Sequence, residues 1–365
     1  MSFENHPNAK KVYEYYQQRY SLGSLGLWHA LGLASIFNGN DRIRPILSSF
    51  IIANGGSFKS QIMKSFKDSN STRYWEVPFQ PTDRGIVREN IGRGGETKSK
   101  HNNKIWLFDD AAVSFPSLET ARQSRLLGLL TTGLMDQKYS YSDFSDTREM
   151  NVRFGAYINI AYQNFELIKK ILEEKTILER AVPFNYILHS VDVDRANKEF
   201  MSGFEYGKIP KFKFEKTIIK NTHEYFDKIK YVEQTIQEYC NLSQNRSFMW
   251  SWIMIEAVAI LEGRKQVIKE DFLLFNKYIL PYLSLNIRVE PIQRSMIRML
   301  NINPEAKLDE FENFLNSDIC NKEFPNDKFI YQLIKKEERA KLFESAIAYV
   351  QKEKFIQERA GVVIQ

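Results

Sequence analysis

Cysteine is scarce in this sequence: Cys240 and Cys320 are the only two among 365 residues. Two thiols so far apart argue against a disulfide framework and against a zinc cluster, which both need several cysteines at short spacings. The five histidines do not cluster at ligand spacings, so we assign them no metal chemistry. No stretch of about 18 apolar residues occurs, which excludes a membrane-spanning helix. The polar first residues lack the apolar segment of a secretory signal, so we expect a cytoplasmic protein.

The composition describes a chain that is able to bury a large core. Apolar residues make up 43% of the sequence, aromatic residues 13% and charged residues 26%. This content excludes a mostly disordered protein, in which low hydrophobicity and high net charge prevent burial from offsetting the entropy of ordering. The length exceeds what one ordinary core holds, so we expect two or more domains. The net charge of +6 is a mild excess that permits a polyanionic partner without demanding one.

Four short apolar runs predict strands, and helical stretches lie between them. The runs are rich in β-branched or aromatic residues, and turn or polar residues bound them. Strands that alternate with helices indicate a parallel sheet covered on both faces, which is an α/β fold. The predicted strands are Ile46–Ala53, Ile105–Phe108, Phe154–Tyr162 and Tyr186–Val191, and the predicted helices between them are 59–67, 117–136 and 165–175.

Helical periodicity dominates the sequence segments before and after this α/β region. Residues 9–37 predict one helix, and the strand signals end after about residue 195. Three further helices are then predicted, and Asp271 is the expected cap at the start of the last one. These three predicted helices are 221–240, 245–263 and 269–282.

The C-terminal region combines three short helical patterns, a fourth stretch at 338–350 and a final FIQERAGVVIQ. We interpret the final residues as two strands around a turn at Arg359–Gly361, and three helices with a hairpin indicate a winged-helix module. The predicted organisation is an N-terminal helical segment 1–39, an α/β nucleotide-binding domain 40–200, a helical lid 201–290 and a winged-helix domain 291–365.

The junction ANGGSFKSQ at 53–61 has the parts of a phosphate-binding loop. Such a loop needs backbone N–H donors, a helix N-terminus, a lysine for the β- and γ-phosphate oxygens and a hydroxyl for Mg²⁺. Gly55, Gly56, Lys59 and Ser60 supply them. The full G-x-x-x-x-G-K-[ST] pattern is not met, because Phe58 stands where a glycine would let the loop wrap the phosphates. The alternative is an ordinary glycine-containing loop that enters a helix.

Two further polar positions follow apolar strands. Asp109 and Asp110 end the second strand, where one carboxylate could reach Mg²⁺ and the other could orient an attacking water. Asn164 follows the third strand and could position that water, although the sequence does not decide between Asn164 and Asn159. Taken alone, an aspartate there could also cap a helix and an asparagine could form a turn.

The ordered set of segments resembles the AAA+ ATPases, and among them the branch with a helix-2 insert and a pre-sensor-1 hairpin, above all the minichromosome maintenance (MCM) replicative helicases. The resemblance covers about residues 40–280. The segments that carry it are TDRGIVREN…GRGGETKSKHNNKIWLFDDA, LLTTGLMDQKYSYSDFSDTREMNVRFGAYINIAYQN, ILERAVPFNYILHSVDVD and NRSFMWSWIMIEAVAILEGRKQVIKEDF.

The resemblance implies a DNA-acting motor, a helicase or a DNA translocase, that binds and hydrolyses ATP with Mg²⁺ and works as a homo-oligomer, which is a ring in such families. Asp110 would be the catalytic carboxylate and Asn164 the sensor-1 residue. Arg180 would reach the ATP of a neighbouring subunit, and Arg246 would be the sensor-2 arginine. The nucleotide would be held by Gly55, Gly56, Ser57, Phe58, Lys59, Ser60 and Gln61, and Mg²⁺ by Ser60 and Asp109.

Basic residues of the inserts and of the predicted wing are candidate DNA contacts, because phosphate contacts bind without sequence readout. Solvated charged surface is the alternative for each of them. The candidates are Arg84, Arg88, Arg93, Lys98 and Lys100 in the first insert, Lys138 and Arg148 in the hairpin, and Lys354 and Arg359 in the wing.

The departures from the family pattern keep two other functions open. Phe58 in the phosphate loop, and an aspartate at position 110 where glutamate is usual, are compatible with a hydrolysis-deficient structural or DNA-loading subunit. A protein-remodelling AAA+ ATPase would keep the nucleotide site and act on a different partner. The chain also has no room for the large N-terminal domain and zinc ribbon of MCM proteins.

Overall fold

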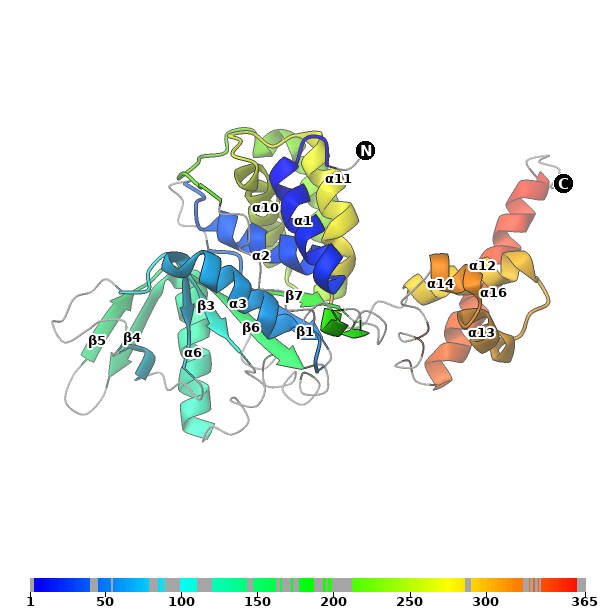
Figure 1. Ribbon diagram of the computed structural model, residues 1–365, viewed down its shortest axis with the longest axis horizontal. Coiled ribbons are helices and arrows are strands. Elements are labelled where there is room, and N and C mark those ends of the chain that lie inside the picture. The colour runs from blue at the N-terminus through cyan, green and yellow to red at the C-terminus, as the bar shows by residue number, and fades with distance from the viewer. Residues whose placement is uncertain are drawn as a thin grey trace. The chain divides into compact units, whose positions relative to one another are not determined.

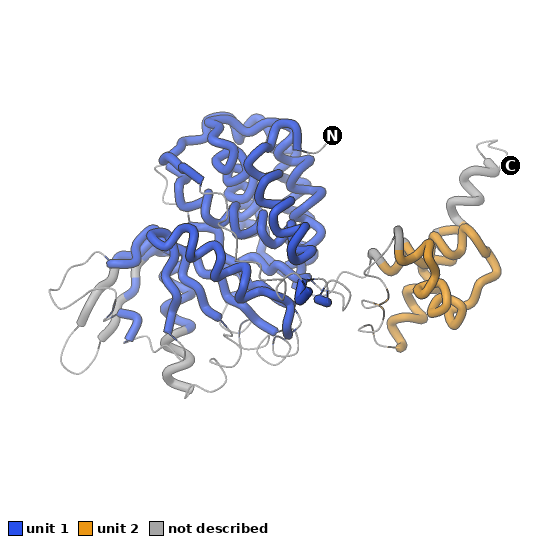
Figure 2. Tube along the Cα trace, in the orientation of Figure 1, with its two compact units in different colours: residues 1–286 blue, residues 287–365 orange. Residues whose placement is uncertain are grey.

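The chain divides into two compact units, residues 1–286 and residues 287–365, and each is described by itself (Figure 2). The boundary lies four residues before the predicted start of the C-terminal domain at 291. The computed structural model describes residues 3–39, 45–53, 55–78, 85–87, 89, 99–109, 120–142, 147–161, 165, 172, 177–186, 193–194, 196–198, 212–285, 290–323, 328, 331, 334 and 336–359.

The first unit contains a parallel sheet, as predicted (Figure 1). Within the described residues the sheet has five strands in the order β2-β3-β6-β1-β7, and all the neighbouring pairs are parallel. The α/β prediction is therefore confirmed. The strands are β1 (Ser49–Ala53), β2 (Tyr74–Glu76), β3 (Lys104–Phe108), β6 (Phe154–Ala161) and β7 (Val182–Asn185).

Both faces of the sheet are buried, which explains why its central strands are nearly continuous apolar runs. Helices α2 (Gly23–Ser35) and α3 (Lys59–Ser69) share one core with alternate strand residues, and α6 (Thr120–Asp136) shares the other. The approach of α2 to the sheet is close: a Cβ added at Gly32 would lie 2.0 Å from the hydroxyl of Tyr157.

The N-terminal helices and the three helices that the sequence predicts as a lid pack together and form one helical layer on one side of the sheet (Figure 1). The predicted helix 9–37 is two helices, α1 (Pro7–Tyr20) and α2, because Ser21 adopts a left-handed backbone with φ of 56°. The helices predicted as a lid are α9 (Phe226–Cys240), α10 (Gln244–Leu261) and α11 (Lys269–Tyr278), close to their predicted bounds.

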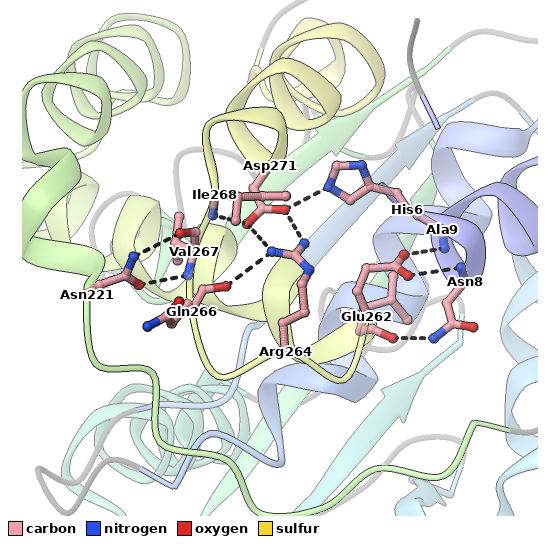
Figure 3. Close-up of polar contacts among 11 residues, drawn as sticks. His6, Asn8, Ala9, Asn221, Glu262, Arg264, Gln266, Val267, Ile268 and Asp271 are labelled. Carbon is pink, nitrogen blue, oxygen red and sulfur yellow. Dashed lines mark hydrogen bonds and ion pairs between the residues drawn. The ribbon is translucent and has the colours of Figure 1, made fainter. Parts of the chain in front are cut away.

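A buried polar network ties α1 to the ends of α10 and α11 (Figure 3). Asp271 accepts hydrogen bonds from the N–H of Ile268 at 2.9 Å and from Arg264 Nη1 at 3.0 Å, and His6 Nε2 lies 2.7 Å from its Oδ1. Asp271 is thus the helix-start cap that the sequence predicts. Burial raises the pKa of Asp271, but hydrogen bonds from His6 and Arg264 outweigh it and hold the pKa below its usual value.

An antiparallel hairpin lies between α6 and β6, where the resemblance places a pre-sensor hairpin. Its strands are β4 (Lys138–Ser142) and β5 (Thr147–Asn151). The predicted strand Tyr186–Val191 is wrong at Tyr186, because the strand in this region is β7 at Val182–Asn185. Pro183 disfavours a strand in the sequence, but β7 is an edge strand of the described sheet, where a missing N–H is tolerated.

The described part of the second unit is helical, with α12 (Glu290–Ile302), α13 (Leu308–Leu315), α14 (Asp318–Glu323) and α16 (Lys336–Arg359). The prediction of a terminal hairpin is wrong for the residues up to Arg359, because α16 is helical through this residue. The segment QKEKFIQER consists mostly of strong helix formers, and these outweigh the short β-like pattern. Lys354 and Arg359 therefore lie on a helix, and residues 360–365 lie outside the described residues.

No helix among the described residues is long and apolar enough to span a membrane.

Candidate functional site

The loop between β1 and α3 carries the predicted phosphate-binding residues. Gly56 and Phe58 both have left-handed backbones, with φ of 70° and 59°, and α3 begins at Lys59 directly afterwards. Space is open around Gly55 and Gly56, where an added Cβ would meet nothing within 4 Å. Within the described residues no side chain caps α3. The N–H groups of its first turn can therefore bind an anion at this end of the helix.

Phe58 keeps a backbone conformation that glycine adopts without strain. A left-handed backbone is unfavourable for a bulky residue, so the surrounding structure must hold it there. Its ring lies 5.3 Å from the ring of Tyr20 on α1, centroid to centroid, and packs against the core of the first unit. The side chain is thus anchored to α1, and the loop turns at position 58 despite the missing glycine.

The Lys59 ammonium spans the loop. Its Nζ donates to the carbonyl oxygen of Ala53 and to Oγ of Ser57, both at 3.1 Å. Ser57 in turn is held from β7, because the Tyr186 hydroxyl donates to the Ser57 carbonyl oxygen at 2.7 Å. Burial raises the pKa of Tyr186, so its hydroxyl stays protonated and remains a donor. Tyr186 was missed as a site residue because its role follows only from its position at the end of an adjacent strand.

Ser60, Asp109 and Asn159 converge at the carboxyl edge of the sheet. The Ser60 hydroxyl donates to Asp109 Oδ1 at 2.6 Å, and Asn159 Nδ2 donates to the same oxygen at 3.1 Å. The pairing of Phe108 with Ile158 brings the next residues of β3 and β6, Asp109 and Asn159, side by side. The hydroxyl and the carboxylate that the sequence paired across 49 positions are thus in contact.

Asn159, which the sequence left as the alternative to Asn164, lies beside Asp109. Its side chain is 1% exposed, and its Oδ1 has no hydrogen-bond partner among the described residues. A buried amide oxygen without a partner is unfavourable by about 1–3 kcal/mol, which suggests a group that it would bind. Asn164 lies outside the described residues.

The chemistry of the donor set fits Mg²⁺ and a phosphate. Magnesium prefers oxygen ligands and often takes only one or two from the protein, with water and phosphate completing the shell. Ser60 Oγ and Asp109 Oδ1 are such oxygens, and Lys59 begins the same helix as Ser60. No group of three or more histidine, cysteine, aspartate or glutamate residues that could hold a metal by itself occurs in the part of the chain that the structure describes.

Arg180 and Arg246 lie together, away from this site. Arg180 Nε donates to the carbonyl oxygen of Thr131 on α6 at 3.3 Å, and Nη1 lies 3.7 Å from Glu179. Arg246 Nη1 contacts the sulfur of Met135 on the same helix at 3.0 Å. Burial, and then the charge of Arg246, lower the pKa of Arg180.

The sheet separates these arginines from the Ser60–Asp109 contact. Arg180 precedes β7, whose Val182 pairs with Ser49 at the start of β1, whereas Lys59 and Ser60 follow the end of β1. Ala53 is four residue steps after Ser49, which is about 13 Å along the strand. Arg180 therefore lies at the amino edge of the sheet and the candidate phosphate site at the carboxyl edge.

The remaining predicted residues fall into four groups. Lys100 is exposed in the turn just before β3. Gln61 is half-buried on α3, one residue after Ser60. The backbones of Lys138, Arg148, Lys354 and Arg359 are described, on β4, β5 and α16, but their side chains lie outside the description. Outside the described residues altogether are Asp110, Asn164, Arg84, Arg88, Arg93 and Lys98.

No protein-family model matches this chain, and no curated protein sequence matches it. The functional conclusion therefore depends on the residues, their geometry and the resemblance of the sequence segments.

Proposed function

We propose that this protein is a Mg²⁺-dependent AAA+ ATPase of the helix-2-insert branch, resembling the MCM helicases, that acts on DNA as an oligomer. One observation carries the proposal: Ser60 at the start of α3 donates to Asp109 at the end of β3, beside the lysine of a glycine loop. Lysine, hydroxyl and carboxylate in this arrangement are the parts that a P-loop NTPase uses to hold a nucleoside triphosphate.

Each residue of the site has a specific role in the proposed ATP hydrolysis. The Lys59 ammonium, now bonded to Ala53 and Ser57, would turn to the β- and γ-phosphate oxygens when ATP enters. Ser60 and Asp109 would hold Mg²⁺, which when bound neutralises charge on the phosphates. The amide of Asn159 could hydrogen-bond the attacking water or the γ-phosphate. Asp110 would orient that water.

The position of Arg180 supports an oligomer, which in the family that the chain resembles is a ring. Because Arg180 lies at the edge of the sheet opposite Lys59, it does not reach the site of its own chain. An arginine that stabilises the transferred phosphoryl group would then come from a neighbouring subunit. We extend the same proposal to Arg246, which lies beside Arg180.

DNA is proposed as the partner from the family resemblance, and two features support it. The hairpin β4–β5 stands between α6 and β6, where the resemblance expects a DNA-contacting insert. A second unit of helices follows the ATPase unit, and the winged-helix proposal for it now depends on these helices alone. Lys138 and Arg148 remain the proposed hairpin contacts.

A hydrolysis-deficient subunit is the second candidate function, and Phe58 favours it. The Cβ and ring at position 58 occupy a turn where glycine allows the closest approach of backbone to phosphate. Such a subunit would bind ATP weakly, or bind it without turnover, and would keep its assembly surfaces.

Steady-state ATP turnover with and without single-stranded DNA tests the proposal, with Lys59→Ala as the disabled variant. Lys64→Ala is the matched control, since Lys64 is an exposed lysine on the same helix. DNA-stimulated turnover that Lys59→Ala abolishes and Lys64→Ala retains supports the DNA-acting ATPase. Turnover that ignores DNA favours a protein partner, and binding without turnover favours the hydrolysis-deficient subunit. A native chain that neither binds nor hydrolyses ATP would refute the proposal.

A further inference from the structure

Three basic residues gather at the amino edge of the sheet, on the β2 and β3 side. Arg73 directly precedes β2 and Lys104 begins β3, and the pairing of Tyr74 with Ile105 places the two residues opposite each other. Neighbouring strands are about 4.8 Å apart, so the two side chains start from adjacent points on this edge. Lys100 belongs to the turn just before β3. We call Arg73, Lys100 and Lys104 the basic cluster.

The turn that carries Lys100 is held firmly against the sheet. His101 stacks on Trp75 of β2 with centroids 4.3 Å apart and an interplanar angle of 7°. Trp106 of β3 donates its indole N–H to the His101 carbonyl oxygen at 3.2 Å. A charged group on such a fixed turn loses little conformational freedom when it binds a ligand.

The basic cluster has no carboxylate partner among the described residues. Arg73 lies over the ring of Phe37, 4.8 Å from its centroid, and Lys104 Nζ contacts Nδ1 of His101 at 3.4 Å. Neither residue, nor the exposed Lys100, forms an ion pair within the described structure. The described acid in this area is Glu89, and it lies 3.8 Å from Nε2 of His101.

The charges of the cluster repel one another. Burial, and then the charges of Lys100 and Arg73, lower the pKa of Lys104. Burial and the charges of Lys104 and Lys100 also lower the pKa of His101 to about 4, so His101 is neutral at pH 7 and adds no cation. A bound polyanion would relieve this repulsion.

We propose that Arg73, Lys100 and Lys104 bind the phosphate backbone of a nucleic-acid strand. A strand carries one negative charge for each 3.4 Å of its axis, so that a line of phosphates can meet several neighbouring cations at once. An acidic protein surface would need an equally dense run of carboxylates. This surface lies at the edge of the sheet opposite the Ser60–Asp109 site, and it deepens the proposed function by naming where DNA is contacted.

Fluorescence anisotropy of a labelled single-stranded oligonucleotide tests the proposal on the full chain, without nucleotide or Mg²⁺. The test variant is the triple substitution Arg73→Gln, Lys100→Gln and Lys104→Gln. The matched control removes the same total charge from three exposed lysines of the helical layer, and it combines Lys11→Gln, Lys265→Gln and Lys269→Gln. Thermal melting verifies that both variants fold, and Lys100→Glu on the exposed turn replaces the triple variant if it does not.

Native protein and control variant should bind alike at low salt, and the cluster variant should bind at least tenfold more weakly. The slope of log K against log salt should fall in magnitude by about 2, since each lost phosphate contact on a single strand contributes about 0.7. Equal losses in the two triple variants, no binding by the native chain at low salt, or a cluster variant that loses binding to poly-glutamate and keeps binding to DNA would each overturn the proposal. Because ATP is absent, the result does not depend on whether the ATPase proposal holds.

Discussion

At the scale of single residues, Phe58 shows how a loop can keep its shape without its usual glycine. The backbone is left-handed at φ of 59°, and contact with Tyr20 holds the ring on α1. The strain and the ring contact oppose each other, so that replacing the ring has a small net effect on folding. Its effect on the ligand should be larger, because the Cβ of residue 58 lies in the turn that would wrap the phosphates.

Phe58→Gly should therefore bind ATP more tightly, by a factor of up to about ten, which corresponds to 1.4 kcal/mol. A fluorescent ATP analogue measures the affinity, and turnover measured in parallel shows whether hydrolysis gains as well. Phe58→Ala is the control, since it removes the ring and keeps the Cβ, and it should gain less. Weaker binding by Phe58→Gly than by the native chain would contradict this account of the loop.

His29 makes folding sensitive to acid. The ring is fully buried between Phe66 and Tyr157, neither ring nitrogen has a hydrogen-bond partner among the described residues, and burial lowers its pKa to about 3. The unfolded chain binds a proton at His29 below pH 6.5 and the folded chain does not. This contribution is therefore neutral above pH 6.5, and it lowers stability progressively as the pH falls toward 3.

Between pH 7.5 and pH 5, His29 should reduce the free energy of unfolding by about 2 kcal/mol. Urea unfolding at the two pH values measures the loss in the native chain and in His29→Leu, where the loss should be smaller by this amount. His223→Leu, at an exposed histidine, should keep the native loss. An unchanged loss in His29→Leu would mean that the ring is protonated in the folded state.

At the scale of helices and strands, the polar network around Asp271 joins α1 to the neighbouring ends of α10 and α11, two helices far from it in sequence (Figure 3). Glu262 at the end of α10 accepts the N–H groups of Asn8 and Ala9 at 3.0 and 2.7 Å, and so satisfies the start of α1. Asp271 joins His6 to Arg264 across the same region. The network holds α1 against the ends of α10 and α11.

Asp271→Ala should lower the free energy of unfolding by about 3 kcal/mol, because it leaves His6 and Arg264 partly buried without their partner. Denaturant unfolding of the full chain, monitored with a spectroscopic probe in the first unit, measures this loss of stability. Asp227→Ala is the control, since Asp227 is an exposed first-turn carboxylate of α9, and it should change stability by no more than about 0.5 kcal/mol. Equal effects would mean that the network adds nothing to stability.

The sequence predicts those strands that have a continuous apolar run of four or more residues, and β1, β3 and β6 lie where it places them. It missed β2, because three residues carry too little pattern. In the candidate site, Ser60 and Asp109 follow from two local motifs. One is the glycine loop that enters α3, and the other is the aspartate at the end of an apolar strand. The contact of Asn159 with Asp109 and the role of Tyr186 do not follow from local motifs, because a strand's register and the order of neighbouring strands decide which side chains meet, and neither is written in local sequence.

At the scale of the whole molecule, the two edges of the sheet carry different chemistry. The carboxyl edge holds Lys59, Ser60 and Asp109, and the amino edge holds Arg180 and Arg246. In the proposed function, a subunit that places these groups on opposite edges carries half of a site at each edge. If the halves meet between subunits, the site is complete only in a closed or stacked assembly with head-to-tail contacts.

Mixing two disabled variants tests this arrangement directly. Lys59→Ala keeps its Arg180, and Arg180→Ala keeps its Lys59, so each alone should have almost no turnover. In an equal mixture, Lys59 of one subunit meets Arg180 of its neighbour at about a quarter of the interfaces, so turnover should return to about a quarter of the native value. The double variant Lys59→Ala, Arg180→Ala, mixed with Lys59→Ala, has no intact interface and should stay inactive. If the first mixture also stays inactive while the variants still assemble, then Arg180 does not act on a neighbour's ATP.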